Sequence, residues 1–521
     1  MQGAVARCWL ALLLIALVLM PGRAGAAEKG HAAAASSSAG AVHAPAEADR
    51  LPGRVETRHT LALPGRSLDY RAVAEPIGLT TEKGEPAASI FTVSYIAERP
   101  AGTERPVAFV FNGGPGAASV FLHLGAIGPR ILETPPTGTV PPPPYRLTDN
   151  PSSWLAFTDL VFVDPVGTGF SRALGKGDNP GKAFWNVEAD LDSLSAVVRR
   201  WLDRHRRWAA PIYLVGESYG GLRAAALAHT LEHDVGITVS GLVLISPALD
   251  ASMLHQPDIG NELAPAIELP SYAAVAAALS GTGKAEEAAA AAARFALSDY
   301  LVGLAHMAGI PAPDDPFIAR VAQLTGLPAE IVRRARGRVS NDTFARELRS
   351  REHRILSLYD GTVSRPGGAD PEHDRAGDPV LVPATAAYTM AFERYLNDWL
   401  DYHTERPYRA LDRKVSQQWD WDAASRGERG LGLALTSLQQ TLLLHPATRV
   451  LIANGRYDLV TPFLGSRWLI DQLALPEPVR AQIRLRVYEG GHMMYMRPQS
   501  RAALAADAAA IFAGRPAAPP R

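Results

Sequence analysis

The sequence predicts an α/β protein with a mostly parallel central sheet and a large helical insertion. Short apolar runs recur along the chain, as expected of strands buried on both faces of a parallel sheet. The runs stop after Pro247 and resume after Thr448, and helical periodicity fills the interval. The predicted strands are Val107–Phe111, Leu160–Val163, Ile212–Val215, Leu242–Ile245, Val450–Ala453 and Leu485–Tyr488.

Other segments complete this prediction. Ser89–Glu98 alternates loosely between apolar and polar side chains, which favours an early antiparallel strand. Within the interval, "AYTMAFERYLNDWL" carries an apolar stripe at helical spacing. "KAEEAAAAAARFAL" is rich in helix formers, and "SNDTFARELRSREHRIL" opens with good capping residues. The stripe is formed by Tyr388, Phe392, Tyr395, Leu396 and Trp399.

These patterns divide the chain into five parts. An insertion on top of the sheet is preferred to an independent second domain, because the strand pattern resumes afterwards as though uninterrupted. The parts are a signal peptide (residues 1–26), a disordered Ala/Ser-rich leader (27–54), the first part of the core (55–247), the helical insertion or lid (248–440) and the second part of the core (441–521).

The first residues resemble a secretory signal peptide. Arg7 precedes an apolar run, Trp9–Met20, and small residues lead to a cleavage point after Ala26. The alternative is an N-terminal membrane anchor, but the run is short for a spanning helix. Cys8 is the only cysteine, so cleavage leaves no disulfide, catalytic thiol or cysteine ligand for zinc. The sequence therefore predicts an exported protein, periplasmic or secreted, with no stable membrane anchor after cleavage.

The overall charge argues against a polyanionic partner. The chain has 52 basic and 53 acidic residues, and its formal net charge is −1. No global field would attract nucleic acid or an acidic membrane. With 47% hydrophobic residues, the chain has an ordinary globular composition and can bury a large core.

The stretch "IYLVGESYGG" (Ile212–Gly221) contains a candidate nucleophile. Ser218 lies in G-x-S-x-G, the sharp turn that presents a serine hydroxyl between a strand and a helix. "IYLV" precedes the turn as a strand, and "LRAAALAHTLEH" follows it as a helix. Gly216 and Gly220 remove side chains that would block so tight a turn.

A catalytic serine requires a base, and the base requires an orienting acid. In folds with this turn, the three residues follow in the order Ser, Asp, His, each in a loop after a strand. "VLIANGRYDLVTP" ends a strand with Asp458, and "LRVYEGGHMMY" ends the next with His492. Together with Ser218 they form a candidate triad.

Two other patterns carry chemistry that we do not expect to operate. "HTLEH" (His229–His233) matches an inverted zinc-binding motif, but no third ligand is evident, so the sequence predicts no metal. Asp164 also follows a strand but precedes Ser218, which breaks the expected order. We expect it to shape the wall of the pocket.

Acyl transfer also requires a second backbone donor for the developing oxyanion. "FVFNGGPGAAS" (Phe109–Ser119) supplies a candidate, with a strand followed by two glycines and a proline. This turn could bring a backbone N–H close to a ligand.

With these motifs in order, the sequence resembles the serine carboxypeptidases, in particular their bacterial exported branch, from about Val107 to Arg497. The resemblance implies the α/β-hydrolase fold. The residues that carry it are "NGGPG" (Asn112–Gly116), "DPVGTGFS" (Asp164–Ser171), "GESYGG" (Gly216–Gly221), "NGRYDLVTP" (Asn454–Pro462) and "GGHM" (Gly490–Met493).

The resemblance also implies roles for seven residues. They are Ser218, Asp458 and His492 as the triad, the backbone amides of Gly114 and Tyr219 as the oxyanion hole, and Asn112 and Glu217 as binders of the substrate's C-terminal carboxylate. The family's usual "ELGP" is replaced by "AIGP" at Ala126–Pro129, so an acid that assists carboxylate binding is missing. Arg130 lies nearby in sequence and is a candidate substitute.

Glu217 beside the nucleophile then has a physical explanation. A neutral carboxylic acid can donate a hydrogen bond to a substrate carboxylate. Burial raises the pKa of such an acid, and a bound carboxylate raises it further by like-charge repulsion. We therefore expect peptidase activity to have an acidic optimum, limited on its alkaline side by ionisation of Glu217.

The sequence thus predicts an exported serine-type carboxypeptidase that needs no cofactor and acts on peptides with a free C-terminus. One alternative is an esterase or acyltransferase with the same triad, because the fold does not fix the acceptor. A more remote alternative is a catalytically silent binding protein that has kept the scaffold.

Overall fold

The computed structural model describes residues 51–98, 104–175, 177–250, 260–368, 374, 376–421 and 432–514. The predicted signal peptide, its cleavage point and Cys8 lie outside the described residues, as does most of the predicted leader.

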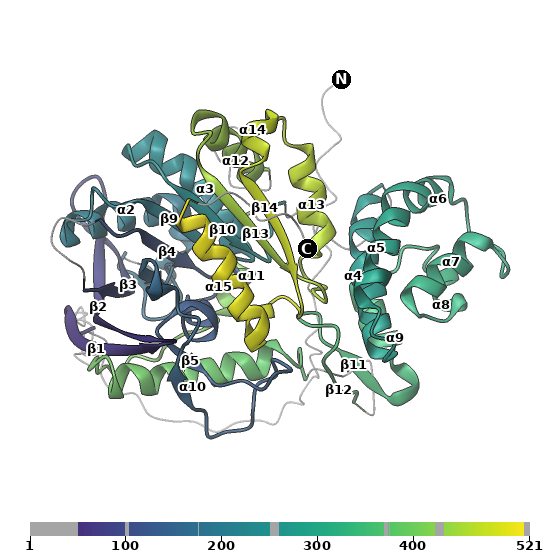
Figure 1. Ribbon diagram of the computed structural model, residues 1–521, viewed down its shortest axis with the longest axis horizontal. Coiled ribbons are helices and arrows are strands. Elements are labelled where there is room, and N and C mark those ends of the chain that lie inside the picture. The colour runs from purple at the N-terminus through teal and green to yellow at the C-terminus, as the bar shows by residue number, and fades with distance from the viewer. Residues whose placement is uncertain are drawn as a thin grey trace, which may run out of the picture. The chain divides into compact units, whose positions relative to one another are not determined.

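A ten-stranded mixed sheet forms the centre of the fold (Figure 1). The strand order is β1-β2-β3-β7-β4-β9-β10-β13-β14, and β8 pairs with β3. From β7 to β14 neighbouring strands are parallel, and β1, β2, β3 and β7 pair antiparallel. The strands are β1 Val55–Leu63, β2 Arg66–Thr80, β3 Pro86–Ala97, β4 Val107–Phe111, β7 Asp159–Val163, β8 Arg172–Ala173, β9 Ile212–Glu217, β10 Gly241–Ile245, β13 Arg449–Gly455 and β14 Ile483–Tyr488.

All six predicted parallel strands are present as β4, β7, β9, β10, β13 and β14, and Ser89–Glu98 falls largely within antiparallel β3. The prediction of an α/β-hydrolase fold is therefore confirmed. Two long strands, β1 and β2, precede β3 and extend the sheet on its antiparallel side.

Helices cover both faces of the sheet and create two apolar cores. In β4, Ala108 and Val110 join one core, whereas Val107, Phe109 and Phe111 join the other. The first core includes side chains of α10 and α15, and Figure 1 shows α15 crossing β10 and β13. The second includes side chains of four helices on the opposite face. The helices are α10 Leu381–Asp398 and α15 Pro498–Phe512 on one face, and α2 Val187–His205, α3 Tyr219–Thr230, α12 Leu433–Leu444 and α13 Phe463–Gln472 on the other.

Between β10 and β13 the chain forms the predicted helical insertion. The helices from α4 to α9 share a third apolar core, which also takes in Tyr457, Leu459 and Leu464 from the segment after β13. The insertion therefore packs against the loop that carries Asp458. Its elements include α4 Leu263–Leu279, α5 Ala285–Phe295, η7 Ala296–Tyr300, α6 Leu301–His306, α7 Pro316–Thr325, α8 Ala329–Arg334, α9 Asn341–Glu347 and α11 Arg413–Gln417.

One predicted helix in this region is shorter than its pattern indicates. Ser340 caps α9 as expected, with its hydroxyl oxygen accepting from the Thr343 N–H at 3.2 Å. The helix ends at Glu347, and the chain reverses at His353, which has a positive φ of 52°. The last residues of the predicted helix instead form β11 (Arg354–Leu356), which pairs with β12 (Ser364–Pro366). Pairing within a local hairpin therefore overrode the helical signal.

One continuous helical run, Ala285–His306, is long and apolar enough by length and composition to cross a membrane. Part of its apolar character has a packing explanation, because several of its side chains belong to the third core. These are Ala289, Ala292, Ala296, Tyr300 and Leu304.

Candidate active site

Ser218 occupies a strained turn between β9 and α3. Its backbone has φ 59° and ψ −126°, a conformation that non-glycine residues rarely adopt. The turn is possible only with glycine at position 216, where an added Cβ would lie 1.8 Å from the Gly220 carbonyl oxygen. Ser218 is partly exposed, although Glu217 and Tyr219 on either side are buried. The turn therefore presents the serine hydroxyl as the motif predicts.

Asp458 and His492 meet in the loops that follow β13 and β14. Asp458 Oδ2 lies 2.8 Å from His492 Nδ1, and both side chains are buried. The backbone N–H groups of Val460 and Thr461 donate to Asp458 Oδ1, at 2.7 and 2.9 Å. The Thr461 hydroxyl lies 2.6 Å from Oδ2. This arrangement holds the imidazole with Nδ1 toward the acid and leaves Nε2 for the nucleophile.

Two backbone contacts fix the position of His492 relative to the serine turn. The Ser246 hydroxyl at the end of β10 donates to the His492 carbonyl at 2.8 Å, and the His492 N–H donates to the Tyr359 carbonyl at 2.5 Å. Ser218 N donates to Ile245 O at 3.0 Å, so the serine turn and the histidine loop both attach to the end of β10. Within the described residues no hydrogen bond joins Ser218 Oγ to His492, and such bonds are often long without substrate.

The acid also affects the protonation of the histidine. Burial alone would lower the pKa of His492, but the Asp458 carboxylate outweighs burial, and the pKa lies above its ordinary value. A base with such a pKa accepts a proton from serine more readily, although it must be neutral before it can act.

The turn after β4 packs against the serine turn. An added Cβ on Gly113 would lie 2.5 Å from the Tyr219 nitrogen, so the two backbones are in direct contact. Gly114 follows with a positive φ of 103°. Among the described residues, neither the Gly114 nor the Tyr219 amide has a recorded acceptor. The turn that carries Gly114 therefore lies against the start of α3, where the Tyr219 amide is located.

Glu217 and Asn112 form a buried pair beside the nucleophile. Asn112 Nδ2 donates to Glu217 Oε2 at 2.5 Å, and Asn112 Oδ1 accepts from the Leu122 N–H at 3.0 Å. The second contact fixes the orientation of the amide, because a backbone N–H must meet the oxygen. A third residue, Tyr495, donates its phenol hydrogen to the same Glu217 Oε2 at 2.8 Å.

Burial raises the pKa of Glu217 to about 7, against the opposing influence of His492 and of hydrogen bonds from Tyr495 and Asn112. The side chain is therefore largely uncharged in mildly acidic solution. In that form its O–H can donate, which an ionised carboxylate cannot do.

The segment with the missing acid lies close by. Ala126 is buried in the π-helical turn η2 (His123–Ile127), and its carbonyl accepts from Asn150 Nδ2 at 2.9 Å. Arg130 does not replace the acid, because its guanidinium donates to Asp149 at 2.5 Å and lies 4.4 Å from the centre of the Trp399 ring.

Asp164 and the "HTLEH" segment, which we did not expect to be catalytic, make hydrogen bonds within the fold. Asp164 is buried, and its Oδ1 accepts from the backbone N–H and the hydroxyl of Ser119, both at 2.9 Å. It thereby anchors the turn that carries Gly114. In the "HTLEH" segment, Glu232 is hydrogen-bonded to His445. Among the described residues, no group of three or more His, Cys, Asp or Glu could hold a metal ion.

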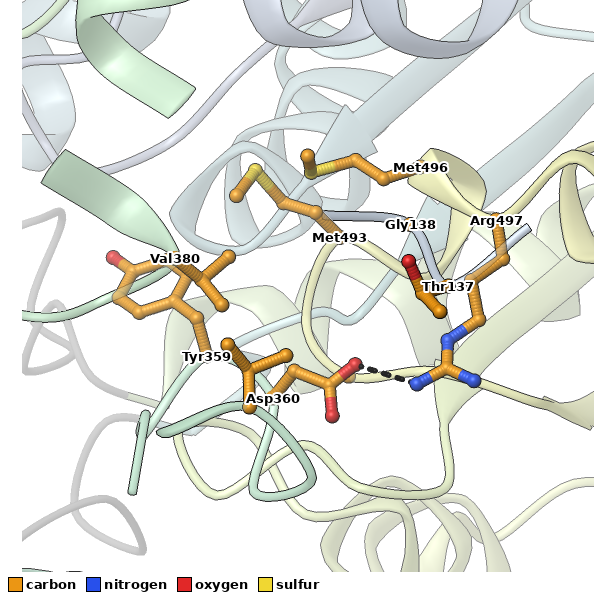
Figure 2. A pocket seen from close by; sticks show the side chains of 10 residues that line it. Thr137, Gly138, Tyr359, Asp360, Val380, Met493, Met496 and Arg497 are labelled. Atoms are coloured by element: carbon orange, nitrogen blue, oxygen red, sulfur yellow. Dashed lines mark hydrogen bonds and ion pairs between the residues drawn. The ribbon is translucent and has the colours of Figure 1, made fainter. Parts of the chain in front are cut away.

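A pocket adjoins the histidine loop (Figure 2). Its lining includes Gly491 and Met493, which flank His492, and Tyr359, whose ring centre lies 5.1 Å from the imidazole. Figure 2 shows Asp360 and Arg497 facing each other, and their ion pair measures 3.2 Å. The pocket therefore combines apolar surface with a charged pair. Its remaining lining residues are Thr137, Gly138, Val363, Val380 and Met496.

The sequence did not predict a role for three buried residues around the site. Tyr495 lies in the quoted stretch after His492 but received no role. Tyr388 was assigned only to an apolar helical stripe, and Thr461 has no recognisable signal apart from its place after Asp458. Sequence periodicity identifies buried side chains but does not show which hydroxyl groups face a functional carboxylate.

The fold, the strained serine turn and the Asp–His pair together define an α/β-hydrolase. The family is indicated by residues 73–256, which match the serine carboxypeptidases. The matched segment includes Ser218, Glu217 and Asn112 and covers about a third of the chain. Asp458 and His492 lie outside the matched segment, so their pairing is an independent structural observation.

Curated relatives show the same family over part of their length. A probable serine carboxypeptidase of Arthroderma benhamiae is 30% identical over 157 residues, which cover 29% of this chain and 28% of the relative. The retinoid-inducible serine carboxypeptidase of Mus musculus is 31% identical over 174 residues, covering 31% of this chain and 33% of the relative. The chain thus aligns with about a third or less of the length of these relatives.

The fold likeness extends much further. The crystal structure of Kex1Δp, a prohormone-processing carboxypeptidase from Saccharomyces cerevisiae, covers 85% of this chain and 91% of its own, with a TM-score of 0.51. The sequence identity is 16%, so this likeness concerns the fold alone.

Proposed function

We propose that this protein is a serine-type carboxypeptidase that removes C-terminal residues from peptides. The observation that carries the proposal is the buried Glu217–Asn112 pair beside Ser218. A hydrolase that recognises only the acyl group of its substrate does not need a buried acid with a pKa near 7 beside the nucleophile. An exopeptidase needs a group that recognises a free terminal carboxylate, and neutral Glu217 can donate to it.

In the proposed reaction, Ser218 Oγ attacks the carbonyl carbon of the last peptide bond while His492 Nε2 takes its proton. Negative charge develops on the carbonyl oxygen, and the amides of Gly114 and Tyr219 donate to it. His492 then returns the proton to the leaving nitrogen, the C–N bond breaks, and the C-terminal amino acid departs. An acyl-enzyme on Ser218 remains.

Water completes the cycle by the same steps. His492 removes a proton from a water molecule, whose oxygen attacks the ester carbonyl, and the proton passes to Ser218 Oγ as the ester bond breaks. Asp458 keeps the imidazole oriented and stabilises its charged form throughout. The residues in place suffice for this chemistry without a cofactor.

Two protonation states limit the proposed activity. His492 must be neutral to act as a base, so activity falls as pH decreases through its pKa. Glu217 must be neutral to bind the substrate carboxylate, so activity falls as pH increases through about 7. The proposal therefore includes an optimum on the acidic side of neutrality.

The test compares three substrates that share one N-blocked dipeptide: the free acid, its C-terminal amide and its C-terminal methyl ester. We expect kcat/KM to favour the free acid over the amide, and the Ser218→Ala enzyme to lose roughly 10⁶-fold in kcat. Turnover of the ester without the free acid would instead indicate an esterase or acyltransferase. No turnover of any substrate by the wild-type enzyme would favour a silent binding protein.

We also propose that the chain belongs to the exported bacterial branch of the family, with residues 1–26 removed on export. Arg7, the apolar run that follows and the small residues before Ala26 support this proposal. Intact-mass measurement of the protein from periplasmic and extracellular fractions should give a chain that begins at Ala27. A protein that retains residues 1–26 in the membrane fraction would contradict it.

A further inference from the structure

Two tyrosines from distant parts of the chain converge beside Glu217. Tyr388 comes from α10, and Tyr495 follows the catalytic-histidine loop in η10 (Met494–Met496). Both meet at Gly125, where an added Cβ would lie 2.6 Å from Tyr388 Oη and 2.8 Å from Tyr495 Cε2. Gly125 immediately precedes Ala126, so the two phenols lie against the segment in which the acid is missing.

The two hydroxyl groups differ in their partners. Tyr495 Oη donates to Glu217 Oε2 at 2.8 Å. Tyr388 Oη is fully buried and has no hydrogen-bond partner among the described residues. A buried hydroxyl without a partner costs free energy comparable to that of a lost hydrogen bond. Such a cost at the edge of an active site points to a partner that arrives with the ligand.

The surroundings suit an anionic ligand. Burial raises the pKa of Tyr388 and of Tyr495 well above the ordinary value for tyrosine, so both remain neutral donors. The buried guanidinium of Arg501 donates to the Tyr495 carbonyl at 3.2 Å and opposes the rise in the pKa of Tyr388. Glu217 is only 3% exposed, so hydrogen bonds to an anion here would form away from bulk water.

We propose that Tyr388 donates a hydrogen bond to the terminal carboxylate of the substrate and that Tyr495 positions Glu217 for the same task. The inference rests on the proposed carboxypeptidase function and identifies residues that determine its specificity. Tyr388 is the specificity-determining residue because it would touch the substrate. Tyr495 is a positioning residue because it acts through Glu217.

The direct test measures binding rather than turnover. In the Ser218→Ala background, calorimetry compares the N-blocked dipeptide acid with its amide, with and without Tyr388→Phe. We expect Tyr388→Phe to weaken binding of the acid roughly 10- to 100-fold, as for loss of a hydrogen bond to a charged group, and to leave binding of the amide unchanged.

Tyr395→Phe is the matched control for this variant. Tyr395 lies on the same helix, is buried, and has its hydroxyl 3.0 Å from Tyr95 Oη. Its loss should affect stability without changing the preference for the acid over the amide. Hydrolysis of the methyl ester by each variant, with Ser218 restored, checks that the fold and the triad are intact.

Tyr495→Phe provides a second, independent readout. The Tyr495 hydrogen bond lowers the pKa of Glu217, so its removal should raise that pKa. The alkaline limb of kcat/KM for the free acid should therefore move to higher pH. A merely structural role would lower activity at every pH without moving the limb.

The outcomes separate this inference from the proposed function. If the wild-type enzyme prefers the acid and Tyr388→Phe weakens acid and amide equally, the inference is wrong and the carboxypeptidase function stands. An unmoved alkaline limb in Tyr495→Phe would overturn the positioning role. If the wild-type enzyme does not prefer the acid over the amide, both the function and the inference fail.

Discussion

Two buried carboxyl groups belong to the candidate site, and their surroundings differ. Asp458 faces four donors, which are shared between its two oxygens. Glu217 receives two hydrogen bonds, both on Oε2, and no donor among the described residues meets Oε1. Both groups are at most 3% exposed, so burial alone does not distinguish them.

The difference explains why burial raises the pKa of Glu217, since few hydrogen bonds compensate a charge there. Donors on both oxygens compensate a buried negative charge, whereas a single occupied oxygen leaves burial to dominate. Asp458 is therefore suited to stabilise an imidazolium ion, and Glu217 to keep its proton and donate it in a hydrogen bond. The predictions below test this contrast.

The largest expected effect follows from replacing Asp458. In Asp458→Asn, the amide cannot replace the charge, and its NH₂ group can face Nδ1 and favour the wrong tautomer of His492. We expect kcat to fall roughly 10⁴-fold for the peptide acid and for the ester alike. Steady-state kinetics on both substrates measure it. If kcat falls only for the peptide acid, then Asp458 acts in recognition of the substrate carboxylate, as Glu217 is proposed to do, and the two acids do not differ in role.

Replacing Glu217 should have a smaller effect, which depends on pH. In Glu217→Gln, the side-chain oxygen can still accept from Asn112 and Tyr495, and the NH₂ group takes the place of the acid O–H. The variant therefore resembles neutral Glu217 at every pH. Two pH units above its pKa, the wild-type acid is roughly 99% ionised, so kcat/KM for the peptide acid should fall about 100-fold in the wild type and not in the variant.

Glu268→Gln is the matched control for this profile. Glu268 is buried in α4, accepts from the Tyr272 hydroxyl at 2.6 Å, and burial raises its pKa to about 8. It lies in the insertion and outside the triad, so its replacement should leave the peptidase pH profile unchanged. If the profile shifts in Glu268→Gln but not in Glu217→Gln, then Glu268 controls the alkaline limb and the assignment to Glu217 is wrong.

The sequence predicted the parallel part of the sheet well because strands buried on both faces are continuous apolar runs. β1 and β2 were not predicted, because β1 is partly exposed and the sequence of buried β2 is interrupted by Glu75, Pro76 and Gly78. In β1, exposed residues alternate with partly buried ones. The β11–β12 hairpin was missed for another reason, since the residues of β11 continue a pattern that favours helix and pair instead with a strand about ten residues further along the chain.

The site follows the same division. Ser218 lies in a local motif, and chain order indicates Asp458 and His492, whose side chains are 2.8 Å apart. Their catalytic roles, like those of Asn112, Glu217, Gly114 and Tyr219, stay predictions for the experiments above. Tyr388 could not be predicted, because its hydroxyl reaches Gly125 only through the packing of α10 on η2.

The smallest effect concerns stability, and it tests whether Glu217 is truly neutral when buried. Its pKa rises from 4.5 in the unfolded chain to about 7 in the folded protein, so the unfolded chain releases this proton first as pH increases. Protonated Glu217 therefore contributes its full share to the free energy of unfolding below about pH 4.5, and this contribution is lost as pH increases from about 4.5 to 7. The full rise corresponds to at most about 3.4 kcal/mol. Denaturant unfolding of wild type and Glu217→Gln at pH 5 and pH 8 measures the difference. The variant should gain more stability relative to the wild type at pH 8 than at pH 5, and Glu268→Gln should do the same from its separate site. An equal difference at both pH values would mean that Glu217 is already ionised in the folded protein, and that it and Asp458 are the same kind of acid.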